Sequence, residues 1–344
     1  MNKSWLLETN GDPLGAVRQF INTIWEQRGF SSILVSMNQG KDPITIPQVI
    51  EDPVQLDQVN PFKPLMTFNT AKMIPNLLRD HPGEEFGVLL RPCEMRALIE
   101  IQKRQPLPAD SLTTLCFDCL GTLPLDDFIW QAERKGDPEG LTDEALRFAR
   151  QGGILAYRYR SACQMCTSPG ANSADININV IGLPIRQHVL IQTKGDDTAR
   201  KLKLDQIIAG EADQLTIDQH ERVLFKLTQR HQHTMDRLFE TLADYLPKNV
   251  DAVVEQLDNC GECQACMDVC PICEVDHPER DSSGRYNRTD VMEWLISCAG
   301  CGMCEQSCPD HLPLSSIFGY IRENLKKEYG YSPGLSANKP NIIH

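Results

Sequence analysis

The chain has 344 residues, of which 41% are hydrophobic and 24% charged, a balance that excludes a disordered or fibrous protein. Its formal net charge is −13, so general binding to the phosphate backbone of nucleic acids is disfavoured. No apolar run reaches the roughly 18 to 20 residues of a membrane helix, and the first residues lack the apolar core of a signal peptide. We therefore expect a cytoplasmic protein with no membrane span.

The first 210 residues follow the pattern of an α/β protein. Apolar spacing predicts helices over 14–27 and 94–103, and strands over 31–35, 86–90, 112–117, 173–180 and 189–193. Strands that alternate with helices favour parallel pairing. The segment 189–193 is expected to pair with 173–180, which makes the predicted sheet a mixed one.

A long helix is predicted over 218–245, and Pro247 ends it. Its apolar face indicates either an amphipathic helix packed on a core or a spacer between two modules. Beyond it the composition changes to Cys, Gly and Pro. We therefore place a domain boundary near residue 250, giving an α/β domain over 1–250, a second domain over 251–318 and a C-terminal tail over 319–344.

Fourteen cysteines are present, nine of them between residues 260 and 308. In a secreted protein this density would indicate a disulfide scaffold. Without a signal peptide it indicates metal ligation.

Two cysteine runs in the second domain share one spacing, C-x-x-C-x-x-C-x-x-x-C-P. This is the spacing of bacterial ferredoxins, in which the fourth cysteine of each run binds the other 4Fe–4S cluster. The first cluster is therefore expected on Cys260, Cys263, Cys266 and Cys308, and the second on Cys298, Cys301, Cys304 and Cys270. We expect an α+β fold similar to a two-cluster ferredoxin.

Paired zinc sites are the alternative, because four cysteines also suffice for zinc. A duplicated run with these short gaps is seldom found in zinc modules, so iron–sulfur clusters are favoured. Cys273 lies outside both runs and is interpreted as a packed free thiol.

The five remaining cysteines lie at predicted strand ends or in turns, where an α/β sheet gathers its binding residues. They are Cys93, Cys116, Cys119, Cys163 and Cys166. Four thiolates there are enough for a third 4Fe–4S cluster. By spacing alone, buried structural cysteines or a redox or zinc C-x-x-C pair remain open.

Four of these cysteines lie in three short motifs, Arg160-Ser-Ala-Cys-Gln-Met-Cys166, Pro92-Cys93 and Cys119-Leu-Gly-Thr122. The first is similar to the signature of one family, the beta subunits of coenzyme F-420 (deazaflavin) hydrogenases and dehydrogenases, and the other two are similar to turns of that family. The run 301–309, with Leu312-Pro-Leu314 and Tyr331-Ser-Pro-Gly334, looks closest to formate dehydrogenase beta subunits.

The resemblance implies an iron–sulfur flavoprotein that binds FAD in the α/β domain beside a 4Fe–4S cluster. The residues matching that cluster's ligands are Cys93, Cys119, Cys163 and Cys166, whereas Cys116 does not match. No residue is assigned to FAD. The first domain is thereby expected to be of flavin type.

The predicted function is electron transfer within an oxidoreductase complex. A flavin would exchange a hydride with a two-electron carrier, deazaflavin by the resemblance, and clusters would connect it to a catalytic formate dehydrogenase, hydrogenase or disulfide reductase subunit. The alternatives are a flavin-free two-cluster carrier and a ferredoxin-dependent reductase of the same broad family. No catalytic acid or base is predicted, and His231 and His233 are interpreted as packed or solvated residues.

Overall fold

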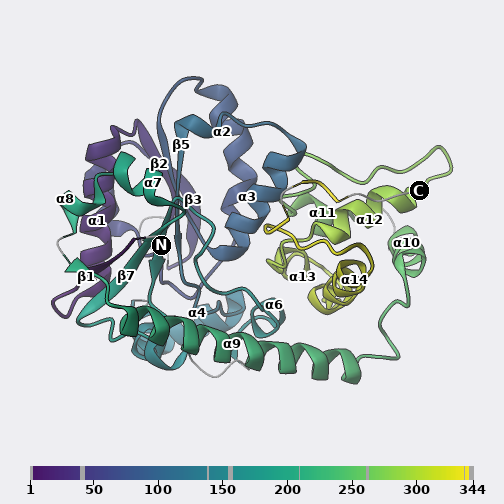
Figure 1. The fold of residues 1–344 in the computed structure, drawn as a ribbon. Coiled ribbons are helices and arrows are strands. Elements are labelled where there is room, and N and C mark those ends of the chain that lie inside the picture. Colours follow the sequence, from purple (N-terminus) through teal and green to yellow (C-terminus); the bar gives the residue numbers. More distant parts are fainter. Residues whose placement is uncertain are drawn as a thin grey trace.

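The computed structural model describes residues 3–38, 43–137, 139–153, 158–208, 210–260, 263–336 and 338–340. A sheet with helices on both faces forms its first part, and a group of helices beside α3 forms its last part (Figure 1). The strands are β1 (Ser4–Glu8), β2 (Ser32–Asn38), β3 (Thr45–Ile50), β4 (Phe86–Leu90), β5 (Leu112–Phe117), β6 (Ile176–Asn179), β7 (His188–Thr193) and β8 (Gly210–Glu211). The helices of the first part are α1 (Pro13–Arg28), α2 (Ile74–Asp80), α3 (Pro92–Arg104), α4 (Leu125–Lys135), α5 (Gly140–Arg147), α6 (Ser161–Gln164), α7 (Asp196–Lys201), α8 (Leu204–Ile207) and α9 (Gln214–Thr241). Those that follow are α10 (Val250–Asn259), α11 (Ala265–Asp268), α12 (Arg288–Ile296), α13 (Met303–Gln306) and α14 (Leu314–Tyr329).

The sheet is mixed, as predicted, with the strand order β3-β2-β4-β5-β6-β7-β1-β8. Strands β2, β4, β5 and β6 pair in parallel, and the outer strands pair antiparallel. The carboxyl ends of parallel strands lie on one edge of a sheet. Cys93 and Cys119, which follow β4 and β5, therefore start from the same edge.

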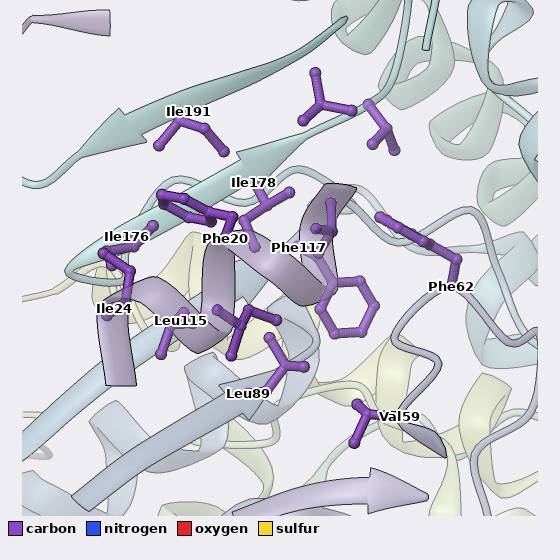
Figure 2. Close-up of a cluster of buried hydrophobic side chains, with 14 of the residues drawn as sticks. Phe20, Ile24, Val59, Phe62, Leu89, Leu115, Phe117, Ile176, Ile178 and Ile191 are labelled. Atoms are coloured by element: carbon purple, nitrogen blue, oxygen red, sulfur yellow. The ribbon is translucent and has the colours of Figure 1, made fainter. Parts of the chain in front are cut away.

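Both faces of the sheet are covered by apolar side chains. Helix α1 places Phe20 and Ile24 against residues of β4, β5 and β6, such as Leu89, Leu115 and Ile178 (Figure 2). On the other face, α2 and α3 pack against the same strands and enclose Cys116 in β5. These two layers fix the edge from which the cysteines project.

The predicted strands over 86–90 and 112–117 coincide with β4 and β5. Helices α1 and α3 begin earlier than predicted, because Pro13 and Pro92 occupy their first turns, where a missing backbone N–H costs nothing. Helix α9 begins at Gln214, because the Asp213 carboxylate accepts a hydrogen bond from the Thr216 N–H at 2.8 Å and caps it. It ends at Thr241, four residues before the predicted end.

The C-terminal part differs from its prediction in two ways. The described residues of 251–318 form helices and an isolated β-bridge between Arg280 and Tyr286, so the expected α+β fold is wrong in its β component. Gaps of two and three residues between cysteines leave room for the single turns α11 and α13 but not for strands. The tail predicted from residue 319 is also wrong, because α14 continues to Tyr329 and buries Ile321 and Leu325. The last residues of that tail, 341–344, lie outside the described residues.

No helix among the described residues is long and apolar enough to cross a bilayer.

A buried carboxylate holds the edge of the sheet where β5 ends. Asp118 is 1% exposed and accepts hydrogen bonds from the N–H groups of Ala171, Val180 and Ile181 at 2.8–2.9 Å. Ala171 follows Cys166 in the chain, and Val180 and Ile181 come directly after β6. Asp118 therefore fixes the turn that carries Cys119 relative to its neighbours.

We expect Asp118→Ala to lower the free energy of unfolding by about 3 kcal/mol or more, because three buried N–H groups lose their acceptor. The midpoint of thermal unfolding measures this. Asp244→Ala, at an exposed position, is the matched control and should change the midpoint little. Equal midpoints for the two variants would contradict this role of Asp118.

Candidate functional site

The four N-terminal cysteines of the predicted third cluster meet at one cavity. Cys93 lies in the first turn of α3, Cys119 follows β5, and Cys163 and Cys166 lie in and after the short helix α6. All four side chains line the same cavity, with Arg91 and Arg160 at its wall. We call these four residues the N-terminal set.

Cationic and hydroxyl groups surround the N-terminal set. Arg91 donates to the Cys119 sulfur at 3.8 Å and Arg160 to the Cys163 sulfur at 3.9 Å. Burial raises the pKa of Cys93 and of Cys119. Burial has the same tendency at Cys163, but the Arg160 guanidinium and the Thr122 hydroxyl, 3.3 Å from its sulfur, outweigh it and lower the pKa of that thiol. The cavity thus favours thiolate at Cys163, the form that binds metals.

The guanidinium groups are also stabilised as cations. Burial opposes the charge of Arg96 and Arg160, but nearby cysteine sulfurs outweigh burial and raise the pKa of both. Buried positive charge beside sulfur suits a site that holds thiolates or an anionic cluster.

The first C-terminal set consists of Cys260, Cys263, Cys266 and Cys308. These four side chains line a second cavity, of about 670 Å³. Burial, followed by Cys260 and other cysteines, raises the pKa of Cys266 to about 12. Cys260 and Cys263 are exposed, whereas Cys308 is buried. The cavity therefore contains the fourth cysteine of the second run and not that of the first.

The second C-terminal set consists of Cys298, Cys301, Cys304 and Cys270. Burial raises the pKa of Cys304, and the other three sulfurs of the set add to the rise. A hydrogen bond with the Cys273 thiol lowers the pKa of Cys270 to about 6, and Trp294 Nε1–H, which donates to the Cys270 sulfur at 3.3 Å, acts in the same direction. Cys270 is thus close to the second run, as the predicted exchange of fourth ligands requires.

The second C-terminal set adjoins the N-terminal set. Cys301 lines the cavity of the N-terminal cysteines and contributes to the raised pKa of Cys93. Arg160 also bonds to the Gln306 side chain of α13, and Arg96 donates to the Ala299 carbonyl at 3.0 Å. The sets therefore follow one another, with the second C-terminal set between the other two.

Among the described residues, no three His, Cys, Asp or Glu side chains converge on a single metal ion. The thiolates of a 4Fe–4S cubane bind different irons, so they need not converge on one point. Cys116 and Cys273, which belong to none of the three sets, are buried in hydrophobic clusters. His231 is packed in the interior and His233 is exposed.

Known proteins resemble this chain in its C-terminal part and over most of its length. Residues 256–312 match the family of 4Fe-4S dicluster domains. The chain is 22% identical to the F420-dependent formate dehydrogenase subunit beta of Methanocaldococcus jannaschii, over 96% of this chain and 94% of that protein. It is 23% identical to the F420-dependent formate dehydrogenase 1 subunit beta of Methanococcus maripaludis, over 75% of each. The predicted family is confirmed. The chain is a relative of the coenzyme F-420 hydrogenase and dehydrogenase beta subunits.

A solved structure shares the fold. A chain of the F420-reducing [NiFe] hydrogenase complex from Methanosarcina barkeri superposes with a TM-score of 0.51 at 11% identity, over 69% of this chain and 91% of that chain. The two-cluster character of the C-terminal part is confirmed by the dicluster match, whereas the flavin type of the first part stays a prediction.

The amino-acid sequence predicts the cysteines of the site but not the side chains around them. Arg91, Arg160 and Trp294 contact sulfur and were not predicted. A usable signal exists for the two arginines, because each stands within three residues of a cysteine and a cation lowers the pKa of a nearby thiol. No comparable signal marks Trp294, which lies 24 residues from Cys270.

The N-terminal and second C-terminal sets meet where Gly302 faces Ala162. Gly302 has a φ of +71°, and a Cβ there would lie 2.4 Å from the Ala162 Cβ. Gly330 has a φ of +62° but open space around it. Replacing each of these two glycines by alanine therefore separates the cost of backbone strain from the cost of overlap between the two parts.

We expect Gly330→Ala to lower the free energy of unfolding by about 1 kcal/mol, because alanine is strained at this positive φ. Gly302→Ala should lower the free energy of unfolding by more than Gly330→Ala does. It should also loosen the contact between α6 and α13, because the backbone has to shift to relieve the overlap with Ala162. Thermal unfolding and the rate of proteolysis between the two parts measure this. Equal losses in both variants would show that the close approach does not matter.

Proposed function

We propose that this chain is the iron–sulfur electron-transfer subunit of a coenzyme F-420-linked oxidoreductase complex. The observation that carries the proposal is the succession of three cysteine sets in adjoining positions, from the edge of the sheet to the exposed end of the C-terminal part. Its partner would be a catalytic subunit of formate dehydrogenase, hydrogenase or disulfide reductase type. The named relatives, which are beta subunits of F420-dependent enzymes, support a role as one subunit of several.

Each set would hold one 4Fe–4S cluster. The first would be bound by Cys260, Cys263, Cys266 and Cys308, the second by Cys298, Cys301, Cys304 and Cys270, and the third by Cys93, Cys119, Cys163 and Cys166. The shared cavity of the first set and the contribution of Cys270 to the raised pKa of Cys304 support the exchange of fourth ligands. Sulfur is a soft ligand suited to iron clusters, and its charge is offset by the guanidinium groups nearby.

FAD is the further cofactor of the proposal. A cavity beside Cys166 and Cys298 offers a donor set for an anionic cofactor, since Arg96, Arg322 and Lys326 line it. It also contains the Ser315 Oγ, a buried hydroxyl with no hydrogen-bond partner among the described residues. These cationic and hydroxyl groups suit the diphosphate of FAD. When bound there, FAD would supply hydride exchange with the deazaflavin and single-electron exchange with the clusters.

The protein's own side chains would hold and tune these groups. Arg91 and Arg160 place positive charge beside the N-terminal set, which favours the reduced, more negative form of a cluster. Trp294 donates a hydrogen bond to the Cys270 sulfur, which acts in the same sense on the second set. The apolar residues Met66, Leu120 and Leu227 line the first cavity and exclude water from it.

Cofactor content tests the proposal. The chain is purified without oxygen, and iron, acid-labile sulfide and flavin are measured per polypeptide. We expect about twelve irons, with equal sulfide, and one flavin. About eight irons without flavin would contradict the proposal and leave a two-cluster carrier whose α/β domain serves for docking.

The third cluster has a test of its own. Changing Cys163→Ser and Cys166→Ser together should lower bound iron by about four atoms, because two of four ligands are lost. Cys116→Ala is the control, since this thiol lies in the core of the sheet and should leave the iron content unchanged. Unchanged iron in the double variant would return Cys163 and Cys166 to a structural role.

A further inference from the structure

The solvent-facing side of α9 carries a stripe of basic residues. They are Arg222, Lys226, Arg230, His233 and Arg237, all of them exposed. Steps of four, four, three and four residues keep them within an arc of about 80° on a helix with 3.6 residues per turn. The stripe is about 22 Å long, because each residue adds 1.5 Å. We call these five residues the α9 stripe.

The stripe contrasts with the rest of the chain, whose 47 acidic residues outnumber its 34 basic ones. No described residue forms an ion pair with Arg222, Lys226 or Arg237. Arg230 donates to the Gly152 carbonyl at 3.2 Å. Between residues 221 and 237 the acidic residues are Glu221 and Asp236. Arg222, Lys226 and Arg237 therefore form a local positive surface that is not neutralised by ion pairs with the described residues.

The opposite side of the same helix lines the N-terminal set. Leu227 and His231 belong to the wall of the cavity that holds its four cysteines. His231 Nδ1–H donates to the Cys166 carbonyl at 2.7 Å. The stripe is thus separated from the proposed third cluster by the thickness of one helix, about 10–12 Å. In Figure 1, α9 runs along the outer edge of the molecule and continues past α6.

The surface of the stripe also has the form of a contact site. Lys226, Arg230, His233 and Arg237 line a shallow hollow, to which Asp236 contributes one carboxylate. Phe225, with 61% of its surface exposed, lies next to it on the helix. An exposed aromatic side chain bordered by unpaired cations is a common composition of the contact surface for a negatively charged protein.

We propose that the α9 stripe docks an acidic electron-carrier protein. The carrier exchanges one electron with the N-terminal set: when it is the donor, its centre is oxidised by one electron and the cluster on Cys93, Cys119, Cys163 and Cys166 is reduced by one. The docking surface rests on the proposed function for the identity of that cluster. It adds to that function an entry or exit point at the end opposite the exposed Cys260 and Cys263.

Charge distribution favours a compact acidic protein over a nucleic acid. DNA carries one negative charge per 1.7 Å and extends along its axis. It would leave the stripe after about 22 Å and meet the surface of a chain with net charge −13. A small acidic protein concentrates its negative charge on one face. It can therefore contact the stripe without contacting the acidic surface around it.

The test uses the full chain and an acidic plant-type [2Fe–2S] ferredoxin as the probe. The stripe variant combines Arg222→Gln, Lys226→Gln and Arg237→Gln, and calorimetry measures the dissociation constant of the complex. At low ionic strength we expect about tenfold weaker binding, because each of the three exposed charges contributes modestly to the attraction. The difference should shrink as salt shortens the Debye length.

A control variant removes three charges elsewhere, with Lys194→Gln, Lys201→Gln and Lys327→Gln at exposed positions. Ferredoxin binding by the control at the native strength, with a loss in the stripe variant, supports the proposal. Equal affinity of the stripe variant and the native chain would overturn it, as would equal losses in stripe and control variants. Binding to anionic lipid vesicles is measured for the same variants. If the stripe variant lost vesicle binding but kept its affinity for ferredoxin, the proposal would also be overturned.

The double variant Cys163→Ser, Cys166→Ser separates this proposal from the proposed function. It should bind ferredoxin as the native chain does but exchange electrons with it more slowly. Unchanged iron in that variant contradicts the third cluster, whatever the dissociation constants are. Loss of iron together with a stripe variant of native affinity contradicts the docking surface alone.

Discussion

Buried guanidinium groups hold the two parts of this chain together at the cysteine sets. Arg160 donates to the Thr122 hydroxyl at 2.7 Å in the first part and bonds to Gln306 in the second. Arg96 spans the same boundary through the carbonyls of Ser168 and Ala299. A buried cation is stable only with anionic or strongly accepting partners, and here the sulfurs supply much of that environment. The same contacts that join the two parts therefore also prepare the sites for thiolate chemistry.

A second buried charge fastens the C-terminal segment. Glu100 in α3 is fully buried and lies 2.6 Å from Lys103 and 3.3 Å from Arg104. It also accepts from the Tyr331 hydroxyl at 2.5 Å and from the Gly334 N–H at 2.8 Å. The segment after α14 is thereby held against α3 rather than left loose. Its position matters for the site, because Ser332, Pro333 and Leu335 line the cavity beside Cys166 and Cys298.

The order of the cysteine sets gives the chain a direction. One end has Cys260 and Cys263 at the surface, and the other has the N-terminal set beneath α9. Trp294 and Cys273 contact the sulfur of Cys270, which belongs to the middle set. A protein built in this way needs two contact surfaces, one for each end, and an interior that keeps water from the centres between them.

The cysteine runs and the alternation of strands and helices could be predicted from the amino-acid sequence, because local spacing and periodicity encode both. The family followed from the resemblance of short motifs. Strands β4 and β5 were predicted to the residue, since a short apolar run between turn residues has few other solutions. The β1, β3 and β8 strands at the outer part of the sheet were missed, because their burial depends on distant neighbours. The packing of the folded chain is what brings Cys93, Cys119, Cys163 and Cys166 to one cavity, with Cys301 beside them. The pairing of charges such as Arg160 with Gln306, 146 residues away, was equally beyond local pattern, because such contacts depend on how the two parts pack.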